Sequence, residues 1–151
     1  MPERGLPAPR WLGAVVLVAP PLGGFVTQWV PNVRASGPLA AAVAAGVGTT
    51  NALAEEVFWR GVPVAVFPDD PWRGWLWPSV GFTAWHLVPL TTGSSSPRRR
   101  ALLLAGAALV GVGYGWIAIS TRSLVMVAPA HALTDSSGVA PVRANWLTRR
   151  S

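Results

Sequence analysis

The amino-acid sequence predicts an all-α fold, a polytopic membrane helix bundle with four or five transmembrane helices and a polar site between them. Hydrophobic residues make up 51% of the 151 residues, and charged residues make up only 12%, about half the usual charged share. All twelve basic residues are Arg, and most of them flank long uncharged runs together with several of the nine Trp residues. Arginine and tryptophan at the ends of apolar runs are typical of anchoring at a membrane surface.

Five apolar segments account for the predicted helices: residues 11–30, 38–67, 74–90, 101–120 and 124–142. The first segment is twenty uncharged residues interrupted by Pro20 and Pro21, and it is long enough to span a bilayer. A signal peptide is the alternative, but its apolar region would be too long. The segment 101–120 is also free of charge, which makes it the clearest candidate for a span.

Turn residues separate these segments. Gly61 and Pro63 are expected to kink or end the second segment. Residues 68–73 and 91–100 are predicted to be loops because Pro, Asp, Gly and Ser cluster there. With no internal repeat, the chain divides into a leader with the first membrane helix (1–37), a core (38–142) and a basic tail (143–151).

Composition also limits the function. The chain has no cysteine, so disulfides and thiolate metal sites are excluded. A net charge of +6 is compatible with nucleic-acid binding. However, the arginines are mostly scattered beside apolar runs, which favours lipid headgroups as their partners. We therefore expect the lipid bilayer, and no nucleic acid, to be a partner of this protein.

Ionisable residues occur where charge is least expected. Both histidines, His86 and His131, and three of the six acidic residues, Glu55, Glu56 and Asp135, lie in apolar segments. A charge at the centre of a bilayer costs about 2.5–3.5 kcal/mol on insertion scales, so such residues usually face each other rather than lipid. A lone histidine or Glu–Arg pair has an ordinary structural explanation, but ionisable groups on three segments favour one shared site.

Spacing assigns the members of this site. Because His131 and Asp135 are four residues apart, they share one helix face. Glu56 and Arg60 have the same spacing and are predicted to form a supporting ion pair, away from the face that Glu55 uses, since Glu55 points about 100° away. We therefore predict that Glu55 converges with His86, His131 and Asp135 on a buried polar cavity.

Two kinds of hydrolytic chemistry fit these residues. A glutamate and a histidine near one water can act as a general base, and a second histidine with an aspartate partner can stabilise an oxyanion. Alternatively, two histidines and a carboxylate suffice for a catalytic zinc ion. No serine lies in a G-x-S-x-G context and cysteine is absent, so acyl-enzyme chemistry has no candidate nucleophile.

Three motifs in order carry a family resemblance: E-E-x-x-x-R at 55–60, F-x-x-x-H at 82–86 and H-x-x-x-D at 131–135. Together they resemble the signature of the CPBP (CAAX protease and bacteriocin-processing, Abi) family, similar to type II CAAX prenyl endopeptidases. The resemblance covers roughly residues 38–142. It implies an intramembrane endopeptidase that cleaves near the C-terminus of a lipidated, for example prenylated, or membrane-embedded peptide or protein.

The same resemblance implies roles for the site residues. Glu55 and His86 would activate water, and His131 and Asp135 would stabilise the oxyanion. The mechanism is either metal-free or dependent on zinc or another divalent metal held by these same four residues. The implied location is integral to the membrane, in the bacterial cytoplasmic membrane. The alternative function is a non-catalytic membrane scaffold or bacteriocin-immunity protein of the same fold.

Overall fold

The computed structural model describes residues 6–31, 33, 37–91 and 96–138, and this part of the chain is helical with no β-strand. The predicted all-α fold class is therefore confirmed. The described residues form two compact units, one within residues 1–16 and 57–124 and the other within residues 17–56 and 125–151. Each unit is built from helices that pack side by side.

Two of the described helices are long and apolar enough to cross a membrane. The first comprises α1 (Arg10–Gly24) and the π-helical turn η1 (Phe25–Trp29), and the second is α7 (Pro97–Thr121). Both coincide with segments predicted to span. The remaining described helices do not meet the same test of length and apolarity, so the expected number of four or five spans stays a prediction.

The second apolar segment remains helical for longer than its turn residues suggest. It comprises α3 (Pro38–Glu56), the π-helical turn η2 (Val57–Gly61) and α4 (Val62–Val66). Gly61 and Pro63 therefore do not end the helix. Pro63 is the second residue of α4, which directly follows the π-helical turn. The π-helical turn directly follows Glu56, so the helix changes its winding at the paired glutamates.

Two predicted loops are shorter than expected. Trp72 and Arg73 belong to the π-helical turn η3 (Trp72–Leu76), followed by α5 (Trp77–Trp85) and α6 (Val88–Thr91). Residues 97–100 form the start of α7, so the loop predicted over 91–100 was wrong there. The Ser96 side chain accepts a hydrogen bond from the Arg99 backbone N–H at 3.3 Å, and Pro97 follows it. This is a standard helix start, and its Ser and Pro had been interpreted as loop residues.

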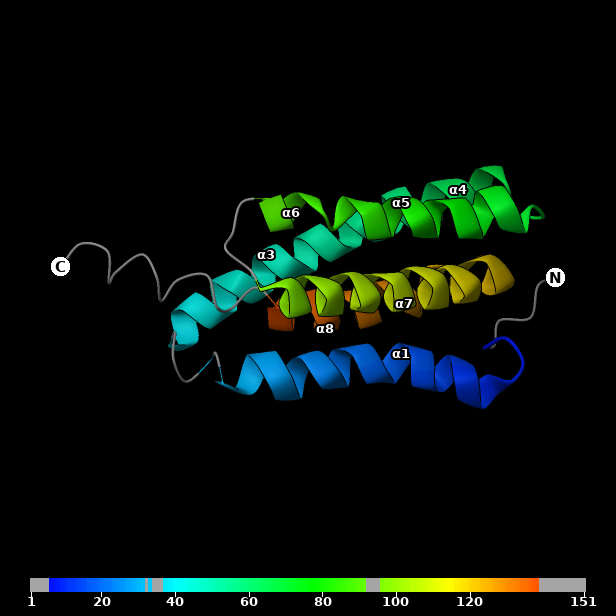
Figure 1. The fold of residues 1–151 in the computed structure, drawn as a ribbon. Coiled ribbons are helices and arrows are strands. Elements are labelled where there is room, and N and C mark those ends of the chain that lie inside the picture. The colour runs from blue at the N-terminus through cyan, green and yellow to red at the C-terminus, as the bar shows by residue number, and fades with distance from the viewer. Residues whose placement is uncertain (1–5, 32, 34–36, 92–95, 139–151) are drawn as a thin grey trace. The chain divides into compact units, whose positions relative to one another are not determined.

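In the first unit, α5 runs along α7 (Figure 1). The contact depends on small residues, because a Cβ on Gly111 would lie 3.2 Å from the Ser79 carbonyl oxygen. Ser79 donates a hydrogen bond to the Gly111 carbonyl at 2.9 Å, and the Trp75 indole donates to the Val112 carbonyl at 2.8 Å. At its other end, α7 finishes at Thr121, and Arg122 follows with a φ of 51°.

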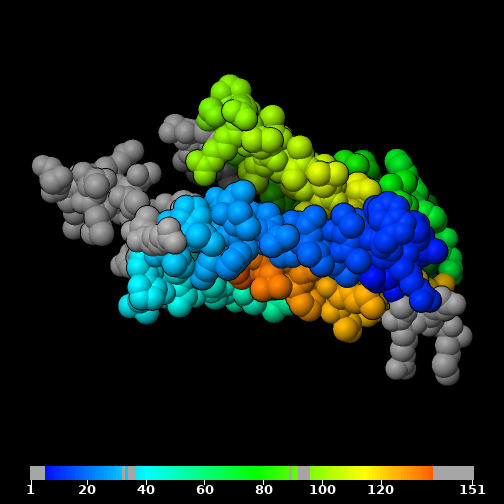
Figure 2. Space-filling view, turned by 90° about the horizontal axis from the view of Figure 1, so that it is seen from below, coloured from blue at the N-terminus to red at the C-terminus, as the bar shows by residue number. Residues whose placement is uncertain are grey.

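In the second unit, α3 packs against α8 (Val127–Gly138). Figure 2 shows the orange atoms of α8 next to the cyan and teal atoms of α3. The backbones approach closely at Gly48, where an added Cβ would lie 2.7 Å from the Asp135 carbonyl oxygen. The hydroxyls of Thr49 and Ser136 form a hydrogen bond of 2.9 Å across this contact. This close approach brings the end of α3 alongside the residues of α8 that bear the third motif.

Candidate active site

His131 is the centre of a polar group within the second unit. Its ring is 2% exposed, and both ring nitrogens face carboxylates. Nδ1 lies 2.8 Å from Glu56 Oε1, whereas Nε2 lies 3.3 Å from Asp135 Oδ1 and 3.8 Å from Glu55 Oε2. The structure thus brings together Glu55, Glu56, His131 and Asp135, four of the six residues singled out from the sequence.

The hydrogen bond to Glu56 determines which nitrogen of His131 carries a proton. With Glu56 ionised, its carboxylate can only accept, and Nδ1 then donates its hydrogen to Glu56. Nε2 then faces the oxygens of Asp135 and Glu55, which are also acceptors. A bare lone pair on Nε2 would be repelled by these oxygens. The arrangement is satisfied by a hydrogen on Nε2, which makes an imidazolium, or by a cation between Nε2 and the carboxylates.

Glu56 therefore has a contact that the sequence did not predict. Glu56 was expected to point away from the helix face that Glu55 uses, but both glutamates contact the same imidazole. The reason is that the two nitrogens of His131 present two different sides of the ring, so side chains about 100° apart on α3 can both reach it. The predicted Glu56–Arg60 ion pair stays a prediction.

Asn51 is a further member of the group that the sequence did not single out. Its side-chain amide donates a hydrogen bond of 3.2 Å to Asp135 Oδ2. Because Asp135 Oδ1 faces His131, Asn51 and His131 hold the two oxygens of one carboxylate. The four-residue spacing of Asn51 and Glu55 was a usable signal, since it places both on one face of α3.

Three of these residues fit a divalent metal ion. Ligand atoms of Glu55, His131 and Asp135 all lie within 4.8 Å of one another. Two ligands at the usual 2.0–2.2 Å from tetrahedral zinc are about 3.4 Å apart, close to the 3.3 and 3.8 Å from Nε2 to the two carboxylates. Glu56 would then orient the ligating imidazole from its other nitrogen, an arrangement common among metal-bound histidines.

His86 belongs to the other compact unit, where it is the C-cap residue of α5. Its Nδ1 is 2.9 Å from the Phe82 carbonyl oxygen, and the two rings are 4.6 Å apart between centroids. Phe82 and His86 thus lie on one face of α5. A carbonyl only accepts, so Nδ1 carries the hydrogen and Nε2 is left with a lone pair that can accept a proton. Its convergence with Glu55 stays a prediction.

Arg60 lies in the same unit as His86 and is 2% exposed. Its guanidinium carbon lies 4.0 Å from the centroid of the Phe82 ring, and Nη2 donates to the Val110 carbonyl at 3.4 Å. Phe82 therefore contacts both Arg60 and His86, and this link between the first two motifs was not predicted. An aromatic face is a favourable place for a desolvated guanidinium.

The described residues form an all-α fold with two candidate membrane spans and a buried group of glutamate, histidine and aspartate, a donor set suited to hydrolysis. The chain belongs to the type II CAAX prenyl endopeptidase Rce1-like family, whose model matches residues 37–137, about two thirds of its length. No curated protein and no solved structure matched. The family confirms the resemblance drawn from the motifs. It identifies a CAAX-type protease, membrane-embedded and acting on a peptide or protein.

Proposed function

We propose that this protein is an intramembrane endopeptidase that hydrolyses a peptide bond near the C-terminus of a lipidated or membrane-embedded substrate. Family membership supports the class of reaction. The observation that carries the proposal is the placement of three carboxylates around the buried His131 imidazole. Such a group is costly in an apolar helix pair, so its presence there points to a function.

In this proposal Glu55 is the general base. Its carboxylate takes a proton from a water molecule while the water oxygen attacks the scissile carbonyl carbon, and His86 Nε2 holds the same water by accepting its second hydrogen. When the tetrahedral intermediate collapses, the C–N bond breaks and Glu55 returns the proton to the leaving amine. A general base of this kind contributes about 10²–10⁴-fold in rate.

His131 stabilises the negative charge that develops on the carbonyl oxygen. With Nδ1 donating to Glu56, a hydrogen on Nε2 is directed toward the side where Glu55 and Asp135 lie, and it can donate to the oxyanion. One such donor contributes about 10²–10³-fold. Glu56 and Asp135 are positioning residues for the ring in this scheme, and Asn51 positions Asp135.

A divalent metal such as zinc is the alternative cofactor. Glu55, His131 and Asp135 would hold it, with His86 as the fourth ligand of the predicted set, and the ion would supply Lewis-acid activation of water. In either form, Glu56 keeps its role because it fixes the ring of His131. We propose the bacterial cytoplasmic membrane as the location and prenylated proteins as one class of substrate.

The test uses the purified full chain in detergent with a peptide that carries a lipidated cysteine near its C-terminus. Mass spectrometry should detect the released C-terminal fragment, and the same peptide without the lipid is the matched control. Glu55→Gln should remain folded and give no fragment. If a chelator abolishes cleavage and added zinc restores it, the metal form is correct. A folded protein that cleaves neither a lipidated nor a membrane-embedded peptide would refute the proposal. The alternative function, a non-catalytic membrane scaffold or immunity protein, would then be favoured.

A further inference from the structure

A second candidate site lies in the unit formed by residues 1–16 and 57–124, and it does not depend on the proposed protease. It is a pocket of about 290 Å³ between the turn that follows α4 and the last turns of α7. Its lining consists of Pro68, Asp69, Pro71, Trp75, Trp116, Ile119 and Ser120. This volume is at the lower end of the range of about 300–1,000 Å³ for small-molecule sites, and it suits a headgroup better than a whole lipid.

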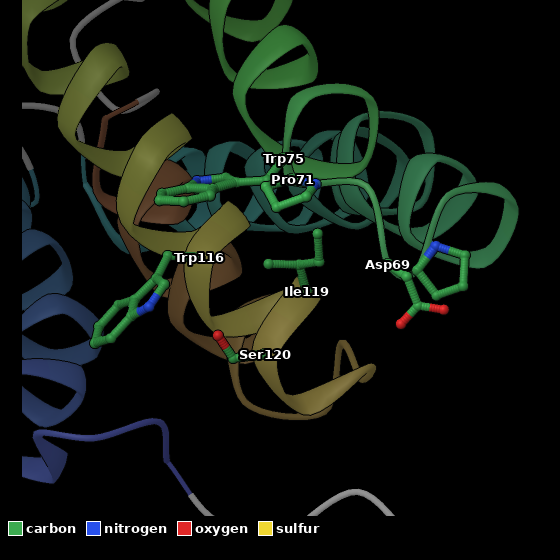
Figure 3. Close-up of a pocket in the computed structure, with 7 residues that line it drawn as sticks. Asp69, Pro71, Trp75, Trp116, Ile119 and Ser120 are labelled. Atoms are coloured by element: carbon green, nitrogen blue, oxygen red, sulfur yellow. The ribbon is translucent and has the colours of Figure 1, made fainter.

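The pocket changes in polarity along α7. Trp116 and Ile119 come before Ser120 on this helix, and Arg122 directly follows its end. Trp116 lies about 7.5 Å from Thr121 along the helix axis at 1.5 Å per residue. Figure 3 shows Trp75 and Trp116 on one side of Ile119 and Asp69 on the other. Because α7 is a candidate membrane span that ends at Thr121, the apolar end lies deeper and the polar end lies near its water-facing end.

The polar end carries one charge of each sign. Asp69 Oδ1 forms an ion pair with Nη2 of Arg122, and both side chains are exposed, at 81% and 48%. In contrast, the neighbouring Asp70 caps the following helix, since its Oδ1 accepts the backbone N–H groups of Trp72 and Arg73 at 2.9 and 3.1 Å. The two adjacent aspartates therefore have different roles, and only Asp69 lines the pocket.

We propose that this pocket binds the headgroup of phosphatidylethanolamine. The primary ammonium donates hydrogen bonds to Asp69 and Ser120, the phosphate pairs with Arg122, and the glycerol and first methylenes pack on Trp75 and Trp116. Tryptophan is favoured at this depth in membranes. A trimethylammonium group has no N–H to donate to these oxygens, and a glycerol headgroup has no positive charge for Asp69.

Native mass spectrometry of the detergent-purified chain tests the proposal. The probes are phosphatidylethanolamine, phosphatidylcholine and phosphatidylglycerol with identical acyl chains at equal concentration. We expect phosphatidylethanolamine to bind about tenfold more tightly than the other two, the effect of one charge-assisted hydrogen bond. Asp69→Asn should abolish this preference. The matched control Asp70→Asn, which removes the same charge one residue away and leaves an amide oxygen for the cap, should retain it.

A second variant covers the case in which Asp69→Asn does not fold. Trp116→Leu should lower the occupancy of all three lipids alike, because it alters only the apolar wall. Equal binding of the three lipids to the native chain would overturn the proposal. So would a preference for phosphatidylglycerol, which would assign lipid binding to Arg122 alone, or an equal loss of preference in Asp69→Asn and Asp70→Asn.

Discussion

Gly48→Ala tests whether the close packing of α3 on α8 sets the geometry of the His131 site. An added Cβ would lie 2.7 Å from the Asp135 carbonyl oxygen and 2.9 Å from the Ser136 backbone nitrogen, where ordinary contact begins at 3.4 Å. Both atoms are backbone atoms of α8, so no side chain can rotate away. The two helices must separate by about 0.7 Å to restore ordinary contact.

This separation is large compared with the distances in the site. If it were transmitted fully, the 2.8 Å contact between His131 and Glu56 would stretch to about 3.5 Å, where a hydrogen bond is largely lost. Overpacking of this kind costs about 1–3 kcal/mol. A displacement near 1 Å in a catalytic group can reduce turnover by about 100-fold. We therefore expect Gly48→Ala to lower both the stability and the peptidase rate.

Gly46→Ala is the matched control, because a Cβ on Gly46 meets nothing within 4 Å. Both substitutions gain the same helix propensity, about 1 kcal/mol, so the difference between the two variants isolates the steric clash. Thermal melting in detergent and cleavage of the lipidated peptide are measured for both. Equal melting temperatures and equal turnover in Gly48→Ala and Gly46→Ala would refute the reasoning.

Three further predictions concern the site residues. Glu55→Gln keeps the shape of the side chain and should reduce turnover by about 10²–10⁴-fold without a change in melting temperature; retained activity would remove Glu55 from the mechanism. Asp135→Asn should have a mild effect on turnover in the metal-free form, because an amide oxygen still supports His131, whereas a parallel fall in bound metal and activity would show that Asp135 is a ligand. Arg60→Ala should lower the stability by about 3–5 kcal/mol if Glu56 loses the predicted ion pair with Arg60, and the folded yield should fall with it. A normal yield with lost turnover would place Arg60 in the chemistry instead.

Much of the fold could be predicted because apolar length and spacing are local properties. The uncharged segments 11–30 and 101–120 coincide with the two candidate spans, and His131 and Asp135 share a face as their spacing requires. The helix start at Ser96 was missed because Ser and Pro are typical both of loops and of the first positions of a helix. The π-helical turn at residues 57–61 was not predicted because such a turn has no clear sequence signature.

The site was less predictable because its details depend on atoms that are distant in the sequence. Spacing alone placed Glu56 away from the helix face that Glu55 uses. A helical wheel does not show that the imidazole of His131 has a nitrogen on each of two sides, so that both glutamates can contact it. The Asn51 contact with Asp135 also depends on how closely α3 approaches α8 at Gly48, which is a property of packing. The role of His86 in activating water and the role of Arg60 in an ion pair rest on the motifs.

The backbone of Arg122 has an evolutionary consequence. Its φ of 51° lies in the left-handed region, and this position after a helix is most often glycine, sometimes asparagine. A residue with a Cβ is strained there by roughly 1 kcal/mol. Selection for stability alone would therefore favour glycine at this position. We expect the arginine to be kept in related chains only where its side chain is needed, and its ion pair with Asp69 at the rim of the pocket is the contact that would need it.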